Sequence, residues 1–213
     1  MIQYAIRNGA NIMDQTHPYN GSLTAEQFLF YEIRIAAKHY VSGLKIDEAI
    51  ERIKKDNLFQ YPTERQVSRL ARACYKRLDA LGNEQLVHEL ASAPNDIAKQ
   101  INLYAVMRYN RLVWEFMIQV IGEKYRNQDM NFSRKDMNAF FSRLQAQDDS
   151  VAAWSDATIT KIKSVLVRML IETGYLDGLK DTTLNPVFLC EELERGIEAN
   201  NDYDALSAFN YFR

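Results

Sequence analysis

The chain has few cysteines, glycines, prolines and histidines. Its two cysteines, Cys74 and Cys190, are too few for a disulfide framework, and a reducing cytoplasm fits them. Eight glycines and four prolines in 213 residues favour helices over a turn-rich β protein. The three histidines stand far apart and share no metal-ligand spacing. These shortages predict a mainly helical protein without a histidine or cysteine metal site.

Long apolar runs are also missing. The most apolar region, Ile97 to Ile121, is interrupted by four charged residues (Lys99, Arg108, Arg111 and Glu115). A membrane-spanning helix needs about 20 predominantly apolar residues. The first residues of the chain lack the apolar segment of a signal peptide. We therefore expect a soluble, cytoplasmic protein with no membrane partner.

No motif of a known catalytic or cofactor site is present. The sequence has no H-E-x-x-H, C-x-x-C, P-loop, G-x-G-x-x-G or G-x-S-x-G. Glu191, Glu192 and Glu194 fit a solvated acidic helix better than a metal patch. We predict no enzyme, no metal and no cofactor. A hydrolase assembled from distant segments is the least favoured alternative.

Charge is unevenly distributed along the chain. The formal net charge is −2, and 47% of the residues are hydrophobic, so the chain can bury a core of ordinary size. Residues 1–80 hold more lysine and arginine than aspartate and glutamate, and residues 148–213 hold half as many basic as acidic residues. The front of the chain is thus mildly basic and its tail is acidic, above all from Glu191 to Asp204.

The stretch from Thr63 to Leu81 has the clearest pattern. At about 100° per residue, a helix here has two opposite faces. The apolar face consists of Val67, Leu70, Cys74, Leu78 and Leu81, and the cationic face consists of Arg65, Arg69, Arg72 and Lys76. Four cations on one face repel one another, and a polyanion is the simplest partner for them. A solvated charged face is the alternative.

The helices before this stretch predict an N-terminal unit at residues 1–82. We expect helices from about Thr24 to Ser42, from Ile46 to Asp56 and from Thr63 to Leu81. Three helices, the last of them basic, are typical of a helix-turn-helix-like bundle. The second connection is longer than the usual tight turn.

Residues 83–213 predict a second unit of central helices followed by a winged-helix-like fold. Ser133 and Asp136 predict the capped start of a helix that reaches Gln147, with a loop at 148–150. A helix from Asp156 to Thr173 would be the recognition helix. Tyr175-Leu176 and the segment 186–189 would form a short β-hairpin, with the polar loop 177–185 as the wing.

The chain resembles the BrxA family of bacterial BREX phage-resistance systems. Several short motifs carry the resemblance: Glu32, the NLFQ of Asn57 to Gln60, Arg65, Arg69, Arg77-Leu78, Trp154-Ser155 with Thr158, and LVRMLIETGYL from Leu166 to Leu176. The resemblance implies a small, mainly helical, cytoplasmic protein that binds double-stranded DNA without known catalysis. It also implies other BREX components as partners, among them a methyltransferase and ATPases.

We therefore predict a non-enzymatic protein that binds double-stranded DNA mainly through its phosphate backbone. The predicted contacts are Arg65, Arg69, Arg72, Lys76, Arg134, Lys135, Lys161 and Arg168. Two alternatives remain open: a protein-interaction adaptor within the defence complex, and an RNA-binding helical protein. The residues alone do not give the oligomeric state.

Overall fold

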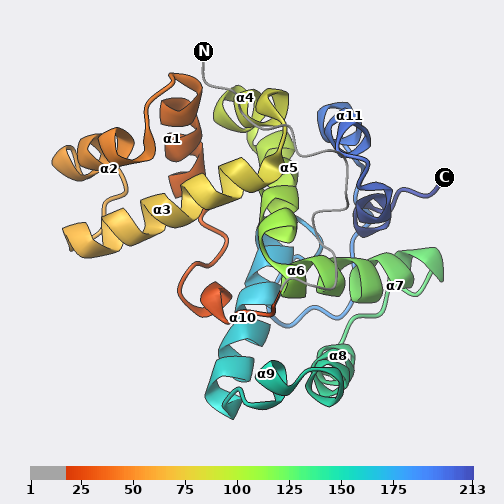
Figure 1. Ribbon diagram of the computed structural model, residues 1–213. Helices are drawn as coiled ribbons and strands as arrows, with labels where there is room; N and C mark the ends of the chain where they lie inside the picture. The colour runs from red at the N-terminus through yellow and green to blue at the C-terminus, as the bar shows by residue number, and fades with distance from the viewer. Residues whose placement is uncertain (1–17) are drawn as a thin grey trace.

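Helices α1 to α11 account for most of the chain that the structure, a computed structural model, describes, which is residues 18–213 (Figure 1). The helices are α1 (Phe30–Val41), α2 (Ile46–Lys55), α3 (Glu64–Leu81), α4 (Glu84–Ser92), α5 (Asn95–Tyr109), α6 (Arg111–Phe116), α7 (Glu123–Arg126), α8 (Arg134–Gln147), α9 (Asp149–Ala152), α10 (Asp156–Glu172) and α11 (Glu191–Ala199). The described residues also form two 3₁₀ segments, Ser22–Thr24 and Tyr203–Phe209, and a π-helical segment, Met117–Gly122. The prediction of a mainly helical fold is confirmed.

Helix α3 is the long crossing element of the N-terminal half (Figure 1). It packs against α1, α2 and α5, and α4 packs on α1 and α5. The Thr63 hydroxyl caps its start by accepting from the backbone N–H of Gln66 at 3.3 Å. Gly82, with φ +60°, ends it in the left-handed conformation that glycine adopts without strain. Helix α1 begins at Phe30, later than predicted, because Leu29 is itself left-handed with φ 54°.

The central helices run from α5 through α6 and the π-helical segment into α7. The side chain of Asn110 separates α5 from α6 by accepting from the N–H groups of Leu112 and Val113 at 3.1 and 3.4 Å. The segment Tyr203–Phe209 lies directly on the π-helical segment. A Cβ at Gly122 would lie 2.7 Å from Ser207 Oγ, so this close approach requires glycine.

A buried polar network ties the C-terminal segment to α3 and α5. Arg108 forms an ion pair with Asp202, and both side chains are at most 3% exposed. The Tyr104 hydroxyl donates to the same Asp202 carboxylate at 2.7 Å. Asn200 donates to the backbone carbonyl of Leu81 at 2.8 Å. The buried core is one cluster that spans both halves, so the division at residues 82 and 83 stays a prediction.

The predicted β-hairpin between residues 175 and 189 is not found. Residues 182–184 pair instead with residues 130–132, through an isolated bridge between Thr183 and Asn131. The N–H of Phe132 donates to the Thr182 carbonyl, and the N–H of Leu184 donates to the Met130 carbonyl, each at 2.7 Å. Residues 182–184 thus pair with a segment about 50 residues earlier, while the N–H of Asn185 donates to the Tyr175 carbonyl at 2.9 Å.

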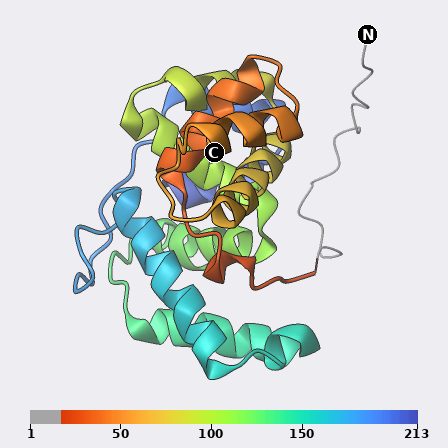
Figure 2. The same cartoon turned by 90° about the vertical axis from the view of Figure 1, so that its left-hand side faces the viewer.

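The predicted loop at 148–150 is also wrong, because Asp148 caps the short helix α9 there. Its carboxylate accepts from the N–H groups of Ser150 and Val151 at 2.9 and 3.1 Å. Helices α8 and α9 lie below the α1–α5 part in both views, and α10 runs from them up to that part (Figures 1 and 2). Among the described helices, none is long and apolar enough to cross a membrane.

Candidate nucleic-acid interface

Helix α3 has the two faces that the sequence predicts. Its apolar face is buried in full, at Val67, Leu70, Cys74, Leu78 and Leu81. Arg65, Arg69, Arg72 and Lys76 are all exposed on the opposite side. The same periodicity that buries one side of the helix therefore presents the four cations to solvent.

The cations of α3 are only slightly compensated. Arg72 pairs with Asp47 of α2 at 3.2 Å, and the two side chains are 54% and 79% exposed. Glu64, the acid nearest the start of the helix, lies 3.5 Å from Lys54 instead. Within residues 18–213, no ion pair joins Arg65, Arg69 or Lys76 to a carboxylate. Three of the four positive charges thus remain available to an anion from outside.

The next arginine of α3, Arg77, is buried, and the sequence reasoning did not predict this. Its guanidinium donates to the backbone carbonyls of Glu26, Gln27 and Phe28, at 2.8 Å for Gln27 and 3.0 Å for Phe28. Burial lowers its pKa. At about 100° per residue, Arg77 falls at the edge of the apolar face, and this position is the signal that could have indicated burial.

The second predicted set of cations lies on α8 and α10. Arg134 and Lys135 are exposed in the first turn of α8, and Lys161 and Arg168 are exposed on α10. The predicted apolar face of α10 is buried at Ile159, Ile162, Leu166, Met169 and Leu170.

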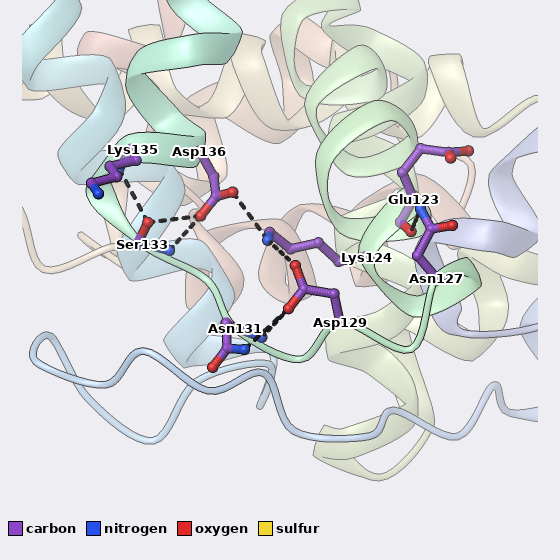
Figure 3. Close-up of polar contacts among 8 residues, drawn as sticks. All are labelled: Glu123, Lys124, Asn127, Asp129, Asn131, Ser133, Lys135 and Asp136. Carbon is purple, nitrogen blue, oxygen red and sulfur yellow. Dashed lines mark hydrogen bonds and ion pairs between the residues drawn. The ribbon is translucent and has the colours of Figure 1, made fainter.

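The start of α8 is held in place by a cluster around Lys124 of α7 (Figure 3). The Lys124 ammonium lies 3.0 Å from both Asp129 and Asp136. The predicted capping box is present, with the Ser133 N–H donating to Asp136 at 2.7 Å and Lys135 N–H donating to Ser133 at 3.2 Å. Burial opposes the ionised form of Asp136, but hydrogen bonds from Lys124 and Ser133 outweigh it and lower its pKa. The cluster therefore sets the direction of the first turn of α8.

Two further cations near this set were not predicted from the sequence. Lys163 joins α10 to α8 by donating to Asn138 Oδ1 at 2.8 Å, and its ammonium lies over the Phe141 ring. Arg143 of α8 donates to Gln119 Oε1 of the π-helical segment at 2.5 Å. Both side chains have partners within the protein, so they connect helices.

The structure brings only part of the two predicted sets together. Gln66 of α3 and Glu172 of α10 line the same groove, so the start of α3 faces the end of α10. Arg65 directly precedes Gln66, Arg69 lies about one turn after it, and Arg168 is about one turn before Glu172. Lys161 lies about 10 Å further along α10, at about 1.5 Å per residue. Arg134 and Lys135 belong to the separate start of α8.

The acidic tail is partly neutralised within the molecule. On α11, Glu191 lies 3.7 Å from Arg195, and Glu194 accepts from Arg213 at 3.0 Å. Arg213 also pairs with Glu198. In the described part of the chain, no three His, Cys, Asp or Glu side chains gather where they could hold a metal ion.

The fold and its surface define a mainly helical protein with exposed cations on α3, α8 and α10. The profile of the BrxA family matches residues 17–201. A relative from Bacillus cereus strain H3081.97, named BREX protein BrxA, is 33% identical over 162 residues, which is 76% of this chain and 80% of the relative. The chain belongs to the BrxA family.

More distant proteins resemble the chain in sequence or in fold. A BREX protein BrxA from Paramagnetospirillum magneticum is 23% identical over 171 residues, 80% of this chain and 85% of the relative. A crystal structure of an uncharacterized protein from Magnetospirillum magneticum superposes with a TM-score of 0.78 at 20% identity, over 90% of this chain and 97% of the other. At this identity, the structural likeness supports the fold alone.

Proposed function

We propose that this chain is a non-enzymatic component of a BREX phage-defence system and binds double-stranded DNA in the cytoplasm. One observation carries the proposal: the exposed cations of α3, of which Arg65, Arg69 and Lys76 have no carboxylate partner among the described residues. A row of such charges along one helix neutralises phosphates and releases counterions. The relatives named BREX protein BrxA support the assignment to a BREX system.

The contacts would position the protein on DNA without reading its sequence strongly. Arginine and lysine on a helix surface favour phosphate oxygens, and phosphate contacts carry no direct sequence information. Arg65, Arg69, Arg72 and Lys76 form the main surface. Arg134, Lys135, Lys161 and Arg168 are the second set of contacts, and the Lys124 cluster holds the start of α8, which carries the first two.

The packing around the two sets of cations supports two finer fold assignments, a helix-turn-helix-like unit and a winged helix. Helix α3 follows α1 and α2 in the order of a helix-turn-helix-like unit and packs on both. Residues 130–132 precede α8, and residues 182–184 follow α10 and pair with them. In a winged helix, a segment before the second helix pairs with a segment after the third, and the predicted wing, 177–185, contains the paired residues 182–184.

Binding of the purified protein to a labelled duplex, measured by fluorescence anisotropy over a range of salt concentrations, tests the proposal. We expect a log–log slope of about 4 to 7, because four to eight contacts contribute about 0.9 each. The triple variant Arg65→Ala/Arg69→Ala/Arg72→Ala should lower that slope by about 2.7. Its helical circular dichroism should stay unchanged. Absence of duplex binding at low salt would contradict the proposal, and unaltered affinity in the triple variant would contradict the site.

A protein-interaction adaptor is the second candidate, and the acidic surface of α11 favours it. Here the α3 cations would bind an acidic partner and the α11 carboxylates a basic one. Purification with the other BREX components, with and without nuclease, separates the two functions. Association that survives nuclease, together with no DNA binding, would favour the adaptor. Competition between duplex RNA and duplex DNA distinguishes an RNA-binding protein.

A further inference from the structure

A groove lies between the start of α3 and the end of α10, next to the main cationic surface. Its volume is about 420 Å³, and its walls come from the segment 25–32, from Tyr61, from α3 and from α10. Six of the lining side chains matter most: Tyr31, Glu32, Tyr61, Gln66, Leu70 and Glu172. Figure 2 shows the end of α10 beside the α1–α3 part, from which it is separated along the chain by the central helices. The groove thus joins segments from both halves.

The polar groups of the groove offer both acceptors and donors. Glu32 is 9% exposed and accepts from the Tyr61 hydroxyl at 2.7 Å. Desolvation and the nearby Glu32 raise the pKa of Glu172, while Lys99 and Arg168 oppose the shift. The Gln66 amide and the Tyr31 hydroxyl can each donate and accept. A ligand with donors and acceptors on one edge can therefore be matched here.

The apolar part of the groove suits a flat ring. Tyr31 lines the groove and is 54% exposed although it is large and aromatic, so part of its side chain is open to a ligand. Phe30 and Leu70 add apolar surface beside it. An exposed aromatic ring next to cations is the usual platform on which a nucleobase stacks, because every base has a π-face.

We propose that this groove binds one unpaired nucleobase of the DNA that the cationic surface holds. A base has donors and acceptors on its pairing edge together with an apolar face, which matches Glu172, Gln66 and Tyr31. Arg69 and Arg168, whose charges act on the groove residues Tyr61 and Glu172, would hold the phosphates on either side. The inference rests on the proposed function, because the phosphate contacts bring the base to the groove.

Other ligands fit the same groups less well. A guanidinium offers donors only, and Glu172 already lies within the field of Lys99 and Arg168. A phosphate offers acceptors only, and Glu32 and Glu172 would repel it. A neutral base can bind without an unpaired carboxylate and without a cation inside the groove. The charge balance therefore favours the base over both alternatives.

Two DNA probes test the inference: a paired duplex, and the same duplex with one unpaired 2-aminopurine. We expect the full chain to bind the second probe about tenfold more tightly, as one stacked base allows. The fluorescence of 2-aminopurine should change on binding. Tyr31→Ala and Glu172→Gln should each remove most of this preference and leave the affinity for the paired duplex within about twofold.

Tyr203→Ala is the matched control, because Tyr203 is 52% exposed and lies on the far C-terminal segment. It should keep the full preference, and thermal unfolding should show that all three variants fold.

Equal affinity of the wild type for both probes would overturn the inference while leaving the proposed function intact. Preference retained in both groove variants would also overturn it. If an arginine-rich peptide binds the wild type but neither groove variant, and the wild type does not prefer the probe with the unpaired base, the groove binds a guanidinium and the inference is overturned. Failure to bind either DNA would instead overturn the proposed function.

Discussion

Helices α3 and α10 have the same construction but present very different surfaces. They are 18 and 17 residues long, each starts at a hydroxyl cap (Thr63 or Ser155), and each buries one apolar face. Yet α3 exposes four cations within three turns, whereas α10 exposes two, separated by Ser164, and ends at Glu172. Capping and periodicity therefore determine where a helix lies. The residues on its outer face determine what it can bind.

The largest expected effect is on folding stability, and it distinguishes the buried Arg77 of α3 from the exposed Arg69. Arg77→Ala removes a buried guanidinium that donates to three backbone carbonyls, so it should lower the free energy of unfolding by about 3 to 5 kcal/mol. Arg69→Ala, on the exposed face, should change it by less than about 0.5 kcal/mol. Urea unfolding followed by circular dichroism measures both. Equal stability of the two variants would mean that Arg77 does not hold the segment 26–28.

The next effect compares the DNA contacts of the two helices. Lys161→Ala/Arg168→Ala should lower the log–log salt slope by no more than about 1.8, because two contacts contribute about 0.9 each. The α3 triple variant should lose more, about 2.7. Anisotropy titrations on one duplex compare them under the same conditions. A larger loss from the α10 pair would make α10 the main DNA-binding helix and α3 the secondary one.

A smaller effect concerns the first turns of α8 and α10. Asp136→Ala breaks the capping box and the contact with Lys124, so it should cost about 1 kcal/mol of unfolding free energy at about pH 7. Since the folded-state pKa of Asp136 is lowered, its contribution is fully present above the ordinary value of 3.8 and is lost as the pH falls through the lowered pKa. Urea unfolding at several pH values measures it.

Asp156→Ala removes the exposed acid in the first turn of α10, which serves as the control. It should cost less, about 0.5 kcal/mol, because only the helix dipole favours that carboxylate. A cost for Asp136→Ala that stays constant down to low pH would mean that the carboxylate charge does not stabilise the start of α8.

The smallest effect concerns the ion pair between Arg72 and Asp47. Asp47→Asn releases the arginine and removes one negative charge beside the cationic surface, so affinity for duplex DNA should rise by up to about threefold. Asp56→Asn makes the same charge change at the exposed C-cap of α2 and should have a weaker effect. Lower affinity in Asp47→Asn would show that this pair positions Arg72 for binding.

Local patterns in the sequence predicted most of the helices and both faces of α3. Thr63, Ser133 and Ser155 each act on a backbone N–H two or three residues later, so their caps are readable from the sequence. Long-range pairing was not readable. Residues 182–184 pair with a segment about 50 residues earlier, and Arg77 is bound to carbonyls about 50 residues earlier. The predicted cations are all exposed, but whether they touch DNA stays a prediction.

The π-helical segment Met117–Gly122 has a consequence for the direction of α7. A π turn holds one more residue than an α turn, so this segment acts as a one-residue insertion in the line of helix from α6 to α7. Because the wider turn absorbs the extra residue, removing one residue there would restore an α turn and leave α7 facing the same way relative to α6. Removing one residue from a regular turn of α6 would instead rotate α7, and with it Lys124 and the start of α8, by about 100°. The π-helical segment thus lets the chain hold one more residue without changing the direction in which α8 begins.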